Sequence, residues 1–281
     1  MLAYLLLRFA AFLCATLPVP WVSHSGFFFG SLGYFLMGAK KKHIQENYQK
    51  LGFSKGQSLR LAVLSLGNYG RLITEILRTQ GFTEQTVLGW DIENEPLLKQ
   101  AYASGRGIAM VTFHFGNWDI AGFSLSLRGY PVSAIADHIG NPRMNRFFIE
   151  TRENKKLKII PSGKATQSID AALQKGEIVA FLFDRPLLAG GLEVLFGSHR
   201  VRIPKGAFYF ARKWGCRLLV GHALRLGPNR FRPTVVCEIP VEMTDNEEAD
   251  MLAAAQKTMD TYRQVITACP EQWHMFRPFG T

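Results

Sequence analysis

The chain has 281 residues, which is enough for one large α/β domain with a substantial core. Lysine and arginine outnumber aspartate and glutamate by 33 to 22, and the resulting net charge of +11 suits anionic partners: membrane lipids, an acidic carrier protein, coenzyme A phosphates or nucleic acid. No Walker loop, GxGxxG motif or CxxC pair is present, so neither a zinc site nor a disulfide framework is predicted for the four separated cysteines, Cys14, Cys216, Cys237 and Cys269.

The N-terminal segment carries no Lys, Arg, Asp or Glu from residue 9 to residue 39, and two prolines interrupt it. It is compatible with one kinked membrane span or with two short apolar helices, about 1–17 and 26–38, lying in the membrane interface. Three consecutive lysines, 40–42, follow it, which the positive-inside rule places on the cytoplasmic side. We expect residues 1–42 to form an N-terminal membrane anchor or interfacial helices with a basic flank.

Beyond this segment, hydrophobic spacing predicts helices over about 57–79 and 95–104. Short apolar runs then alternate with helical stretches. The apolar runs cover 108–113, 132–136, 157–160, 178–183, 192–196, 218–222 and 234–239, and the helical stretches cover 117–128, 143–154, 166–175, 204–215 and 246–268. The alternation predicts an α/β fold in which helices flank a central, mostly parallel sheet and catalytic groups gather at strand ends. We expect residues 43–281 to form one domain.

The apolar run 108–113 ends on His114, and Asp119 follows five residues later. Histidine can take and return a proton near neutral pH, and a carboxylate on its second nitrogen would fix the tautomer. Asn117 is a good helix cap, so Asp119 would lie in a first helical turn, with Gly116 allowing the backbone to fold back. Spacing alone favours the alternative of a structurally buried histidine beside a first-turn acid.

HFGNWD resembles the H-x4-[DE] motif of the glycerolipid and lysophospholipid acyltransferases, in particular the lipid A late acyltransferases and the mycobacterial phosphatidylinositol mannoside acyltransferases. Other stretches resemble this group in the same order: KKKHIQENYQKLGF, NPRMNRFFIETRENKKLKIIPSG, GEIVAFLFDRP, LEVLFGSHRVRIPKGAFYFARKWGCRLLVG and PEQWHMF. The resemblance covers nearly the whole chain. It implies a glycerolipid acyltransferase-like fold and an O-acyltransferase domain over residues 43–281.

The resemblance also implies substrate-binding roles near the expected base. In that group an acid in the region of Asp184 lies near the catalytic base, and arginines bind a phosphate or headgroup, which indicates Arg152 and Arg185. Arginine also gives bidentate phosphate contacts on chemical grounds alone, and strand-end salt bridges are the alternative. We include Asn117 and Glu193 as further substrate-binding candidates. Structural roles are expected for four other histidines: His138, His199, His222 and His274.

These observations lead to one mechanistic hypothesis. His114 removes a proton from an acceptor hydroxyl, or from an amine as the alternative, while that group attacks a thioester. Asp119 orients His114, and backbone N–H groups around 115–117, alone or with a basic side chain, stabilise the oxyanion. Because no serine or cysteine lies in a nucleophile motif, we expect direct transfer without an acyl-enzyme. We expect this reaction to require no metal and no cofactor. Acyl carrier protein or coenzyme A would carry the donor chain, and an apolar groove between sheet and helices would hold it. The acceptor would be a lipid or glycolipid, as in lipid A biosynthesis, at the cytoplasmic face of a bacterial inner membrane.

Two other classes of function stay open. In a lipid hydrolase or thioesterase, His114 would activate water, and product analysis with and without an acceptor alcohol separates this from transfer. A non-catalytic basic protein that binds membranes or nucleic acid would function independently of His114 but depend strongly on salt. The uncharged N-terminal segment and the buried setting expected for His114 argue against nucleic acid.

Overall fold

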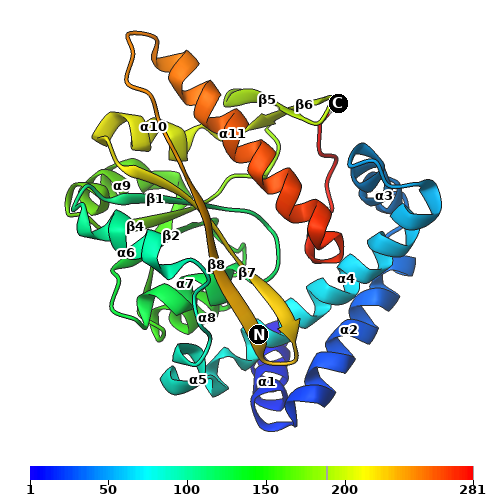
Figure 1. The fold of residues 1–281 in the computed structure, drawn as a ribbon. Coiled ribbons are helices and arrows are strands. Elements are labelled where there is room, and N and C mark those ends of the chain that lie inside the picture. Colours follow the sequence, from blue (N-terminus) through cyan, green and yellow to red (C-terminus); the bar gives the residue numbers. More distant parts are fainter. Residues whose placement is uncertain (188, 281) are drawn as a thin grey trace.

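The computed structural model describes residues 1–187 and 189–280. A six-stranded sheet forms its centre (Figure 1). Its strands, in sheet order, are β3 (Leu157–Pro161), β2 (Val132–Ala136), β4 (Ile178–Leu182), β1 (Ile108–Thr112), β7 (Arg217–Gly227) and β8 (Arg230–Ile239). All neighbouring pairs are parallel except β7 and β8, which pair antiparallel at one edge. The sheet is therefore central and mostly parallel, and the carboxyl ends of its parallel strands lie at one edge.

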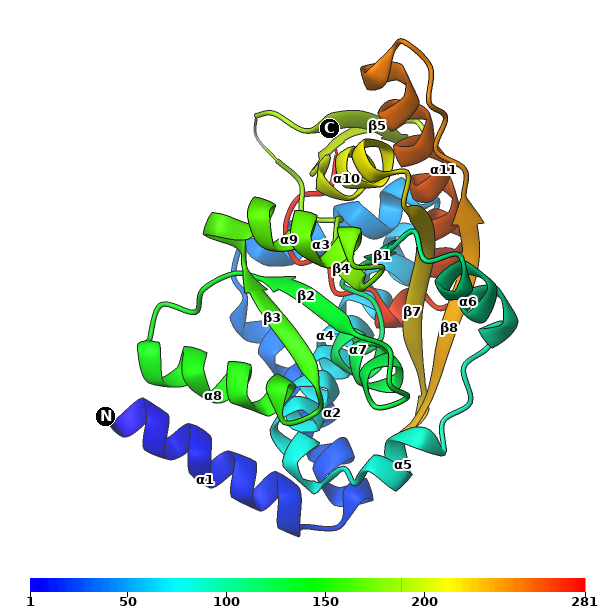
Figure 2. The same cartoon turned by 90° about the vertical axis from the view of Figure 1, so that its left-hand side faces the viewer.

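Helices cover both faces of the sheet (Figures 1 and 2). The helices are α1 (Leu2–Thr16), α2 (Val19–Leu36), α3 (Lys40–Lys50), α4 (Lys55–Arg78), α5 (Glu84–Leu88), α6 (Glu95–Ala103), α7 (Trp118–Ser126), α8 (Pro142–Glu153), α9 (Ala165–Gln174), α10 (Gly206–Trp214) and α11 (Glu247–Ala268). Alternate β1 residues point to opposite faces. Ile108 and Met110 join a core with α5, α6 and α7, whereas Ala109 and Val111 join a core with α9, α10 and α11.

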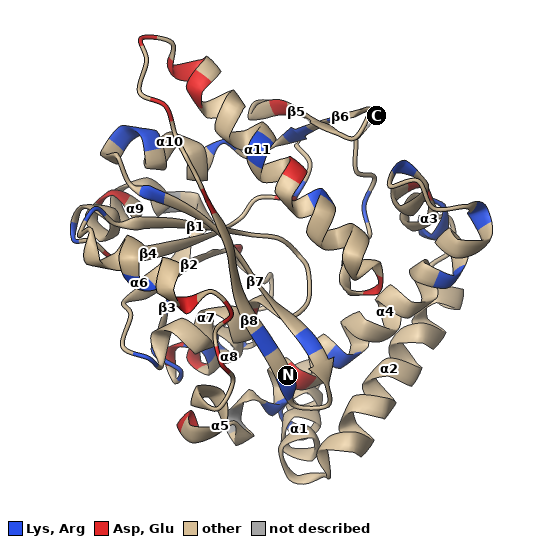
Figure 3. Cartoon of the chain, viewed as in Figure 1, with Lys and Arg blue, Asp and Glu red and all other residues tan. Residues whose placement is uncertain are grey.

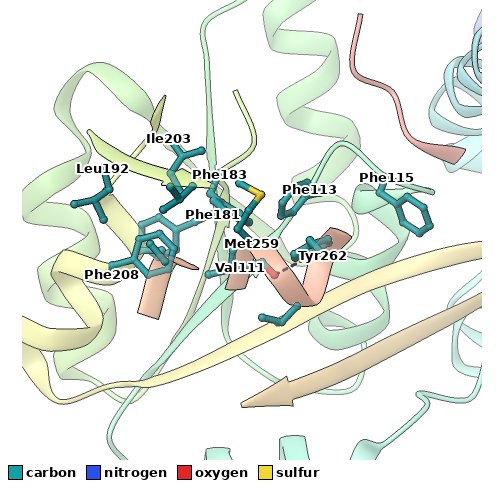
Figure 4. Close-up of a cluster of buried hydrophobic side chains, with 14 of the residues drawn as sticks. Val111, Phe113, Phe115, Phe181, Phe183, Leu192, Ile203, Phe208, Met259 and Tyr262 are labelled. Atoms are coloured by element: carbon teal, nitrogen blue, oxygen red, sulfur yellow. Dashed lines mark hydrogen bonds between the residues drawn. The ribbon is translucent and has the colours of Figure 1, made fainter. Parts of the chain in front are cut away.

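Aromatic rings pack together at the ends of β1 and β4, Phe113 edge-on to Phe183 and stacked on Tyr262 (Figure 4). The ring of Phe113 lies 4.3 Å from that of Phe183 and 3.5 Å from that of Tyr262 on α11, measured between centroids. The Tyr262 hydroxyl donates a hydrogen bond to the carbonyl of Gly221 on β7, at 2.6 Å. Because Phe113 and Phe183 each precede a polar residue at a strand end, this packing fixes where those polar residues emerge.

A separate hairpin of β5 (Leu192–Phe196) and β6 (His199–Ile203) lies beside α11 and outside the central sheet. Its strands alternate between buried and more exposed residues. This pattern is typical of a two-stranded layer with one face on the core. The apolar run expected at 192–196 is thus a strand, but it does not extend the sheet that carries the strand ends.

The expected N-terminal membrane anchor is wrong, because no helix among the described residues has both the length and the apolar character that crossing a bilayer requires. The break at Pro18 divides the apolar segment into α1 and α2. With 15 residues, α1 is about 22 Å long, short of the roughly 30 Å hydrocarbon core. Helix α2 packs along α4 over much of its length (Figure 1).

Four glycines bring α2 and α4 into direct backbone contact. A Cβ at Gly30 would lie 2.3 Å from the carbonyl oxygen of Leu66, and one at Gly70 would lie 2.0 Å from that of Gly26. Gly67 faces the ring of Phe27, and a Cβ at Gly67 would lie only 2.6 Å from that ring. Such close approach leaves no room for a methyl group, so α2 is fixed on the surface of α4, which in turn reaches the site described below.

We therefore expect Gly70→Ala to destabilise the fold by about 1–3 kcal/mol or more, because the clash is with backbone that no rotamer change relieves. Gly33→Ala on α2 is the matched control, since a Cβ there meets nothing within 4 Å. It should be neutral or stabilising by up to about 1 kcal/mol through helix propensity. Chemical denaturation of both variants measures the difference, and equal effects would contradict the close packing of α2 on α4.

Candidate active site

His114 and Asp184 meet just beyond the carboxyl ends of two adjacent parallel strands. The last register pair of β1 and β4 is Thr112 with Leu182, and the two polar residues each lie two positions further on. Asp184 Oδ1 lies 2.7 Å from His114 Nδ1, and Asp184 Oδ2 accepts a hydrogen bond from the His114 backbone N–H at 3.0 Å. The Asp184 side chain is fully buried, and that of His114 is 14 % exposed.

This geometry makes His114 a competent base. A carboxylate is an acceptor, so Nδ1 of the neutral imidazole carries the proton and Nε2 keeps its lone pair. The Trp118 ring packs edge-on against the imidazole, with 5.0 Å between centroids. His114 lines a cavity. The pair therefore forms an imidazole–carboxylate dyad that can take a proton from a group bound in that cavity.

Asp119 has a different partner from the one that its spacing suggested. It lies in the first turn of α7, and its carboxylate accepts two hydrogen bonds from Arg152 on α8, at 2.7 and 3.2 Å. The Arg152 and Asp119 side chains are 20 % and 6 % exposed, and both residues line the same cavity as His114. Asp119 thus fixes the Arg152 guanidinium on the cavity wall. The carboxylate that contacts His114 Nδ1 is that of Asp184, whereas the spacing had suggested Asp119.

The turn after His114 depends on Gly116. Its φ is +60°, and a Cβ there would lie 2.1 Å from the carbonyl oxygen of Ala223 on β7, so only glycine fits. The N–H groups of Phe115, Gly116 and Asn117 all donate to protein carbonyls, namely those of Phe113, Gln272 and Ala223. These three N–H groups are therefore already occupied, and the expectation that they form an oxyanion hole is wrong.

Asn117 is the N-cap of α7, as its residue type suggested. Its side-chain oxygen accepts from the Ile120 N–H at 3.1 Å, and its amide donates to Glu75 on α4 at 2.9 Å. Glu75 also forms a buried ion pair with Arg225 on β7. With 1 % of its surface exposed and both ends engaged, Asn117 holds the turn in place, and it is not among the described residues that line the cavity.

The C-terminal strap, residues 270–280, crosses the HFGN turn. The His274 N–H donates to the carbonyl of His114 at 2.7 Å, and Trp273 forms an isolated antiparallel bridge with Phe115. Asn47 on α3 holds the strap from the other side through hydrogen bonds that involve Met275, Arg277 and Phe279. The asparagine in KKKHIQENYQKLGF therefore acts by positioning the strap, a role that its sequence context did not indicate.

The cavity in front of His114 has a volume of about 1110 Å³, and its wall is mostly apolar. Two alanines in the middle of strands, Ala134 on β2 and Ala180 on β4, line it and are partly exposed although their neighbours Ser133 and Val179 are buried. Ala121 and Gly122 on α7 line the cavity as well. Open space therefore extends between α7 and the sheet, where a packed core would be expected.

The remaining candidates differ in position. Arg185 lines the cavity and forms an exposed ion pair with Asp137 at the end of β2. Glu193 lies on the β5–β6 hairpin, pairs with Arg200 and Arg202, and is not among the described lining residues. Among residues 1–187 and 189–280, no group of three or more His, Cys, Asp or Glu could hold a metal ion.

Two buried histidines of the cavity wall were expected to be structural. Burial lowers the pKa of His222 to about 4, and burial with the nearby Arg225 charge lowers that of His274 to about 3, so both are neutral at neutral pH. Within the described chain neither ring nitrogen of His274 has a hydrogen-bond partner, although the carbonyls of Gly116 and Ser65 lie near the ring. No sequence signal distinguished these two residues from the other histidines.

A buried imidazole–carboxylate dyad at the edge of a mostly parallel sheet, with its histidine on the wall of a large apolar cavity, is an arrangement typical of α/β enzymes that move a proton during group transfer. Residues 1–279 match the model of the bacterial lipid A biosynthesis acyltransferase family, and the chain belongs to this family. It is an acyl-transferring enzyme that acts on lipids or glycolipids.

Curated relatives carry the name phosphatidylinositol mannoside acyltransferase. The protein from Mycobacterium tuberculosis strain H37Rv is 27% identical over 228 residues, which cover 78% of this chain and 69% of the relative. The protein from Mycolicibacterium smegmatis is 26% identical over 220 residues, which cover 76% of this chain and 70% of the relative. These matches confirm the resemblance of the chain to this group.

Proposed function

We propose that the enzyme moves a fatty acyl chain from a thioester to a hydroxyl group of a lipid or glycolipid, with His114 as general base. The hydroxyl oxygen bonds to the thioester carbonyl carbon while its proton passes to Nε2 of His114. The carbon–sulfur bond then breaks, and the proton on His114 neutralises the departing thiolate. The observation that carries this proposal is the His114–Asp184 dyad, whose histidine lines an apolar cavity.

The two acids have separate roles in this proposal. Asp184 holds the His114 tautomer and offsets the charge of the imidazolium that forms. Asp119 keeps Arg152 extended on the cavity wall, where its guanidinium can bind a phosphate or another anionic group of a substrate. Arg185 at the cavity edge is a second cation available for this purpose. Acyl carrier protein or coenzyme A would carry the donor chain as a thioester, and the net charge of +11 favours both, through the acidic surface of the carrier protein or the phosphates of coenzyme A.

The acyl chain of the donor would lie between α7 and the sheet. We call this space the α7-side arm of the cavity, and four small residues line it: Ala121, Gly122, Ala134 and Ala180. His114 shares the strand face of Thr112 and Met110, so a thioester at His114 would direct its chain into this arm. Apolar walls favour each buried methylene by about 0.8 kcal/mol, and the depth of the arm would set the preferred chain length.

Replacing Ala180 by leucine should therefore shift the enzyme toward shorter donors. The larger side chain fills the arm, so kcat/KM for palmitoyl-CoA should fall about tenfold or more relative to octanoyl-CoA, the equivalent of losing two or more buried methylenes. Competition between the two donors in one reaction measures the ratio directly. An unchanged ratio would show that the chain lies elsewhere.

We further propose that the enzyme works on a membrane surface at the cytoplasmic face of a bacterial inner membrane. Large apolar side chains are exposed along α1 and α2, and α2 carries no charged residue (Figure 3). They include Leu2, Leu5, Leu6, Phe9, Phe12, Trp21, Phe28, Phe29, Leu32, Phe35 and Leu36. The lysines that open α3 adjoin them and would contact anionic headgroups. The helices would rest on the bilayer without crossing it.

The double substitution of Phe28 and Phe29 by serine tests this contact. Both side chains are largely exposed, at 63% and 66%, so their loss should leave the fold intact. Binding to vesicles with anionic lipid, measured by sedimentation, should weaken about tenfold or more because each phenylalanine contributes roughly 1.5–3 kcal/mol when buried. Equal binding of both proteins would exclude this surface.

Lipid profiling by mass spectrometry tests the proposed reaction and identifies the acceptor. Cells that carry the protein should contain an acylated lipid that cells with His114→Ala lack, and a lipid A precursor and a phosphatidylinositol mannoside are the two acceptors that the family and the relatives' names suggest. The purified enzyme, given acyl-CoA or acyl carrier protein donors, should form an ester only with the acceptor present. Free fatty acid released at the same rate without acceptor would indicate a thioesterase instead.

A further inference from the structure

The HFGN turn is attached to a buried ion pair that the proposed mechanism does not use. Arg225 on β7 donates two hydrogen bonds to Glu75 on α4, from Nε to Oε1 at 2.5 Å and from Nη2 to Oε2 at 2.7 Å. The Arg225 and Glu75 side chains are only 2% and 8% exposed, and neither residue is among the described residues that line the cavity. A buried ion pair often stabilises a fold no better than apolar residues of the same size, so stability is a weak explanation for this pair.

Glu75 decides which way the Asn117 amide faces. The amide nitrogen of Asn117 donates to Glu75 Oε2 at 2.9 Å, while the side-chain oxygen of Asn117 accepts from the Ile120 N–H at 3.1 Å. A carboxylate only accepts hydrogen bonds, so it selects the NH₂ end of the amide and leaves the oxygen for the N-terminus of α7. An asparagine caps a helix through this oxygen. Glu75 therefore holds the cap of α7 in its working orientation.

The position of His114 depends on this cap. Asn117 follows His114 by only three residues, and the Asn117 N–H is bonded to the carbonyl of Ala223 on β7. With so short a connection, a shift or a reversal of the Asn117 side chain is passed on to the imidazole. Asp119, which holds Arg152, lies in the first turn of α7 and would move with the same helix end.

Arg225 links the ion pair to the C-terminal strap as well. The side-chain oxygen of Gln272 accepts from the Arg225 backbone N–H at 2.9 Å, and its amide nitrogen donates to the Arg225 carbonyl at 2.9 Å. The backbone carbonyl of Gln272 in turn accepts from the Gly116 N–H at 2.9 Å. The ion pair, the strap and the HFGN turn therefore form one hydrogen-bonded unit.

We propose that Glu75 and Arg225 are positioning residues, which hold the HFGN turn through Asn117 so that His114 keeps the geometry that proton transfer requires. The proposal rests on the proposed function, in which His114 is the general base. Neither residue touches a substrate. A misplacement of a reacting group by about 1 Å can lower the rate about 10²-fold, so kcat depends on a charge outside the cavity.

Glu75→Gln tests this role with little change in side-chain shape. One end of the new amide is a donor, so it opposes a donor of either Asn117 or Arg225. We expect kcat to fall about 10²-fold. The Kd for a palmitoyl-CoA analogue with a thioether in place of the thioester should change far less, because the apolar cavity wall is untouched. The kinetic assay uses palmitoyl-CoA with whichever acceptor the wild type acylates, a phosphatidylinositol mannoside or a lipid A precursor.

Asn117→Ser places the second substitution on the other end of the same hydrogen bond. Serine keeps an oxygen that can cap α7 but lacks the amide that reaches Glu75. It should also lower kcat, and the double variant should lose clearly less than the product of the two single effects, since both substitutions remove one interaction. Independent, multiplying effects would show that Glu75 does not act through Asn117.

A second pair of variants separates positioning from stability. Glu75→Leu leaves the Arg225 charge buried and unpaired, whereas Glu75→Leu with Arg225→Met removes both charges and should unfold at a higher temperature than the single variant. Its kcat should stay low, because Asn117 still lacks its acceptor. Recovery of kcat together with stability would make the pair merely structural and overturn the proposal.

Asp250→Asn is the matched control for a buried carboxylate bonded to an arginine. Asp250 on α11 pairs with Arg212 on α10, with side chains 5% and 14% exposed, and neither is among the described residues of the cavity wall. The variant should lose stability and keep the wild-type kcat. An equal loss of kcat in Asp250→Asn and Glu75→Gln would mean that any buried ion pair has this effect, and would overturn the proposal.

NMR of protein with ¹⁵N-labelled histidine reads the position of His114 without any substrate. The proton of the 2.7 Å contact between His114 Nδ1 and Asp184 should give a downfield resonance, which His114→Ala assigns by its loss. Glu75→Gln and Asn117→Ser should shift or broaden this resonance, and Asp250→Asn should not. An unchanged resonance in Glu75→Gln would overturn the proposal. Failure of the proposed function is seen separately, as absent ester formation by the wild type.

Discussion

Replacing Asp184 by asparagine is expected to lower kcat by about 10³–10⁴-fold with little change in fold. The reason is the pair of contacts that the carboxylate makes, one with the His114 backbone N–H and one with Nδ1. The amide oxygen of an asparagine must accept from the backbone N–H, so its NH₂ group then faces Nδ1. Nδ1 has to become the acceptor, the imidazole proton moves to Nε2, and the base loses its lone pair toward the cavity, as in serine proteases with the same substitution.

Asp119→Asn is the informative comparison, because it tests the acid that lies closest to His114 in the sequence. It removes one of the two carboxylate oxygens that hold Arg152. We expect it to raise KM for a phosphate-bearing substrate more than it lowers kcat. Steady-state kinetics of both variants, with circular dichroism and thermal unfolding as checks on folding, give the answer. If Asp119→Asn lowers kcat more than Asp184→Asn does, Asp119 and not Asp184 would be the acid that orients His114.

His114→Ala is expected to lower acyl transfer by about 10²–10⁴-fold, the usual contribution of a general base, while leaving donor binding unchanged. The imidazole is mostly buried, but the backbone contacts of the turn do not depend on it. The backbone N–H at position 114 still donates to Asp184, and the backbone carbonyl there still accepts from the His274 N–H. The Kd for a palmitoyl-CoA analogue with a thioether in place of the thioester should therefore stay within a small factor of the wild-type value.

His43→Ala serves as the matched control for this variant. His43 lies on α3 with an exposed side chain and is not among the described residues of the cavity wall. It should retain full activity. Transfer by His114→Ala at more than a tenth of the wild-type rate, with the fold intact, would mean that another group takes the acceptor proton.

Much of the fold follows from local patterns. The apolar runs at 108–113, 132–136 and 178–183 correspond to β1, β2 and β4 within a residue or two, and Asn117 caps α7 as expected. Other elements lacked such a signal. α3 is polar except for Ile44 and Tyr48, which are one helical turn apart and buried, and too few apolar positions repeat to predict a helix.

The N-terminal segment illustrates a limit of composition. A long uncharged stretch is compatible with a membrane span, an interfacial helix or a helix packed on protein. Composition does not report that Gly26 and Gly30 face backbone of α4, which gives α2 a protein partner along one side. The helix break at Pro18 follows from the local sequence, whereas the tertiary structure decides which element α1 and α2 each pack against.

The sequence by itself determined that a histidine follows a buried strand, that a helix cap lies three residues later at Asn117 and that the body is a mostly parallel α/β fold, because strand periodicity and helix capping are local signals. Only the tertiary structure decided which acid orients His114. β4 is inserted between β2 and β1 in the sheet, so Asp184, 70 residues away in the chain, reaches Nδ1. Asp119 is turned toward Arg152 by the helix that Asn117 starts. Sheet order depends on how whole elements pack, and no short spacing along the chain encodes it.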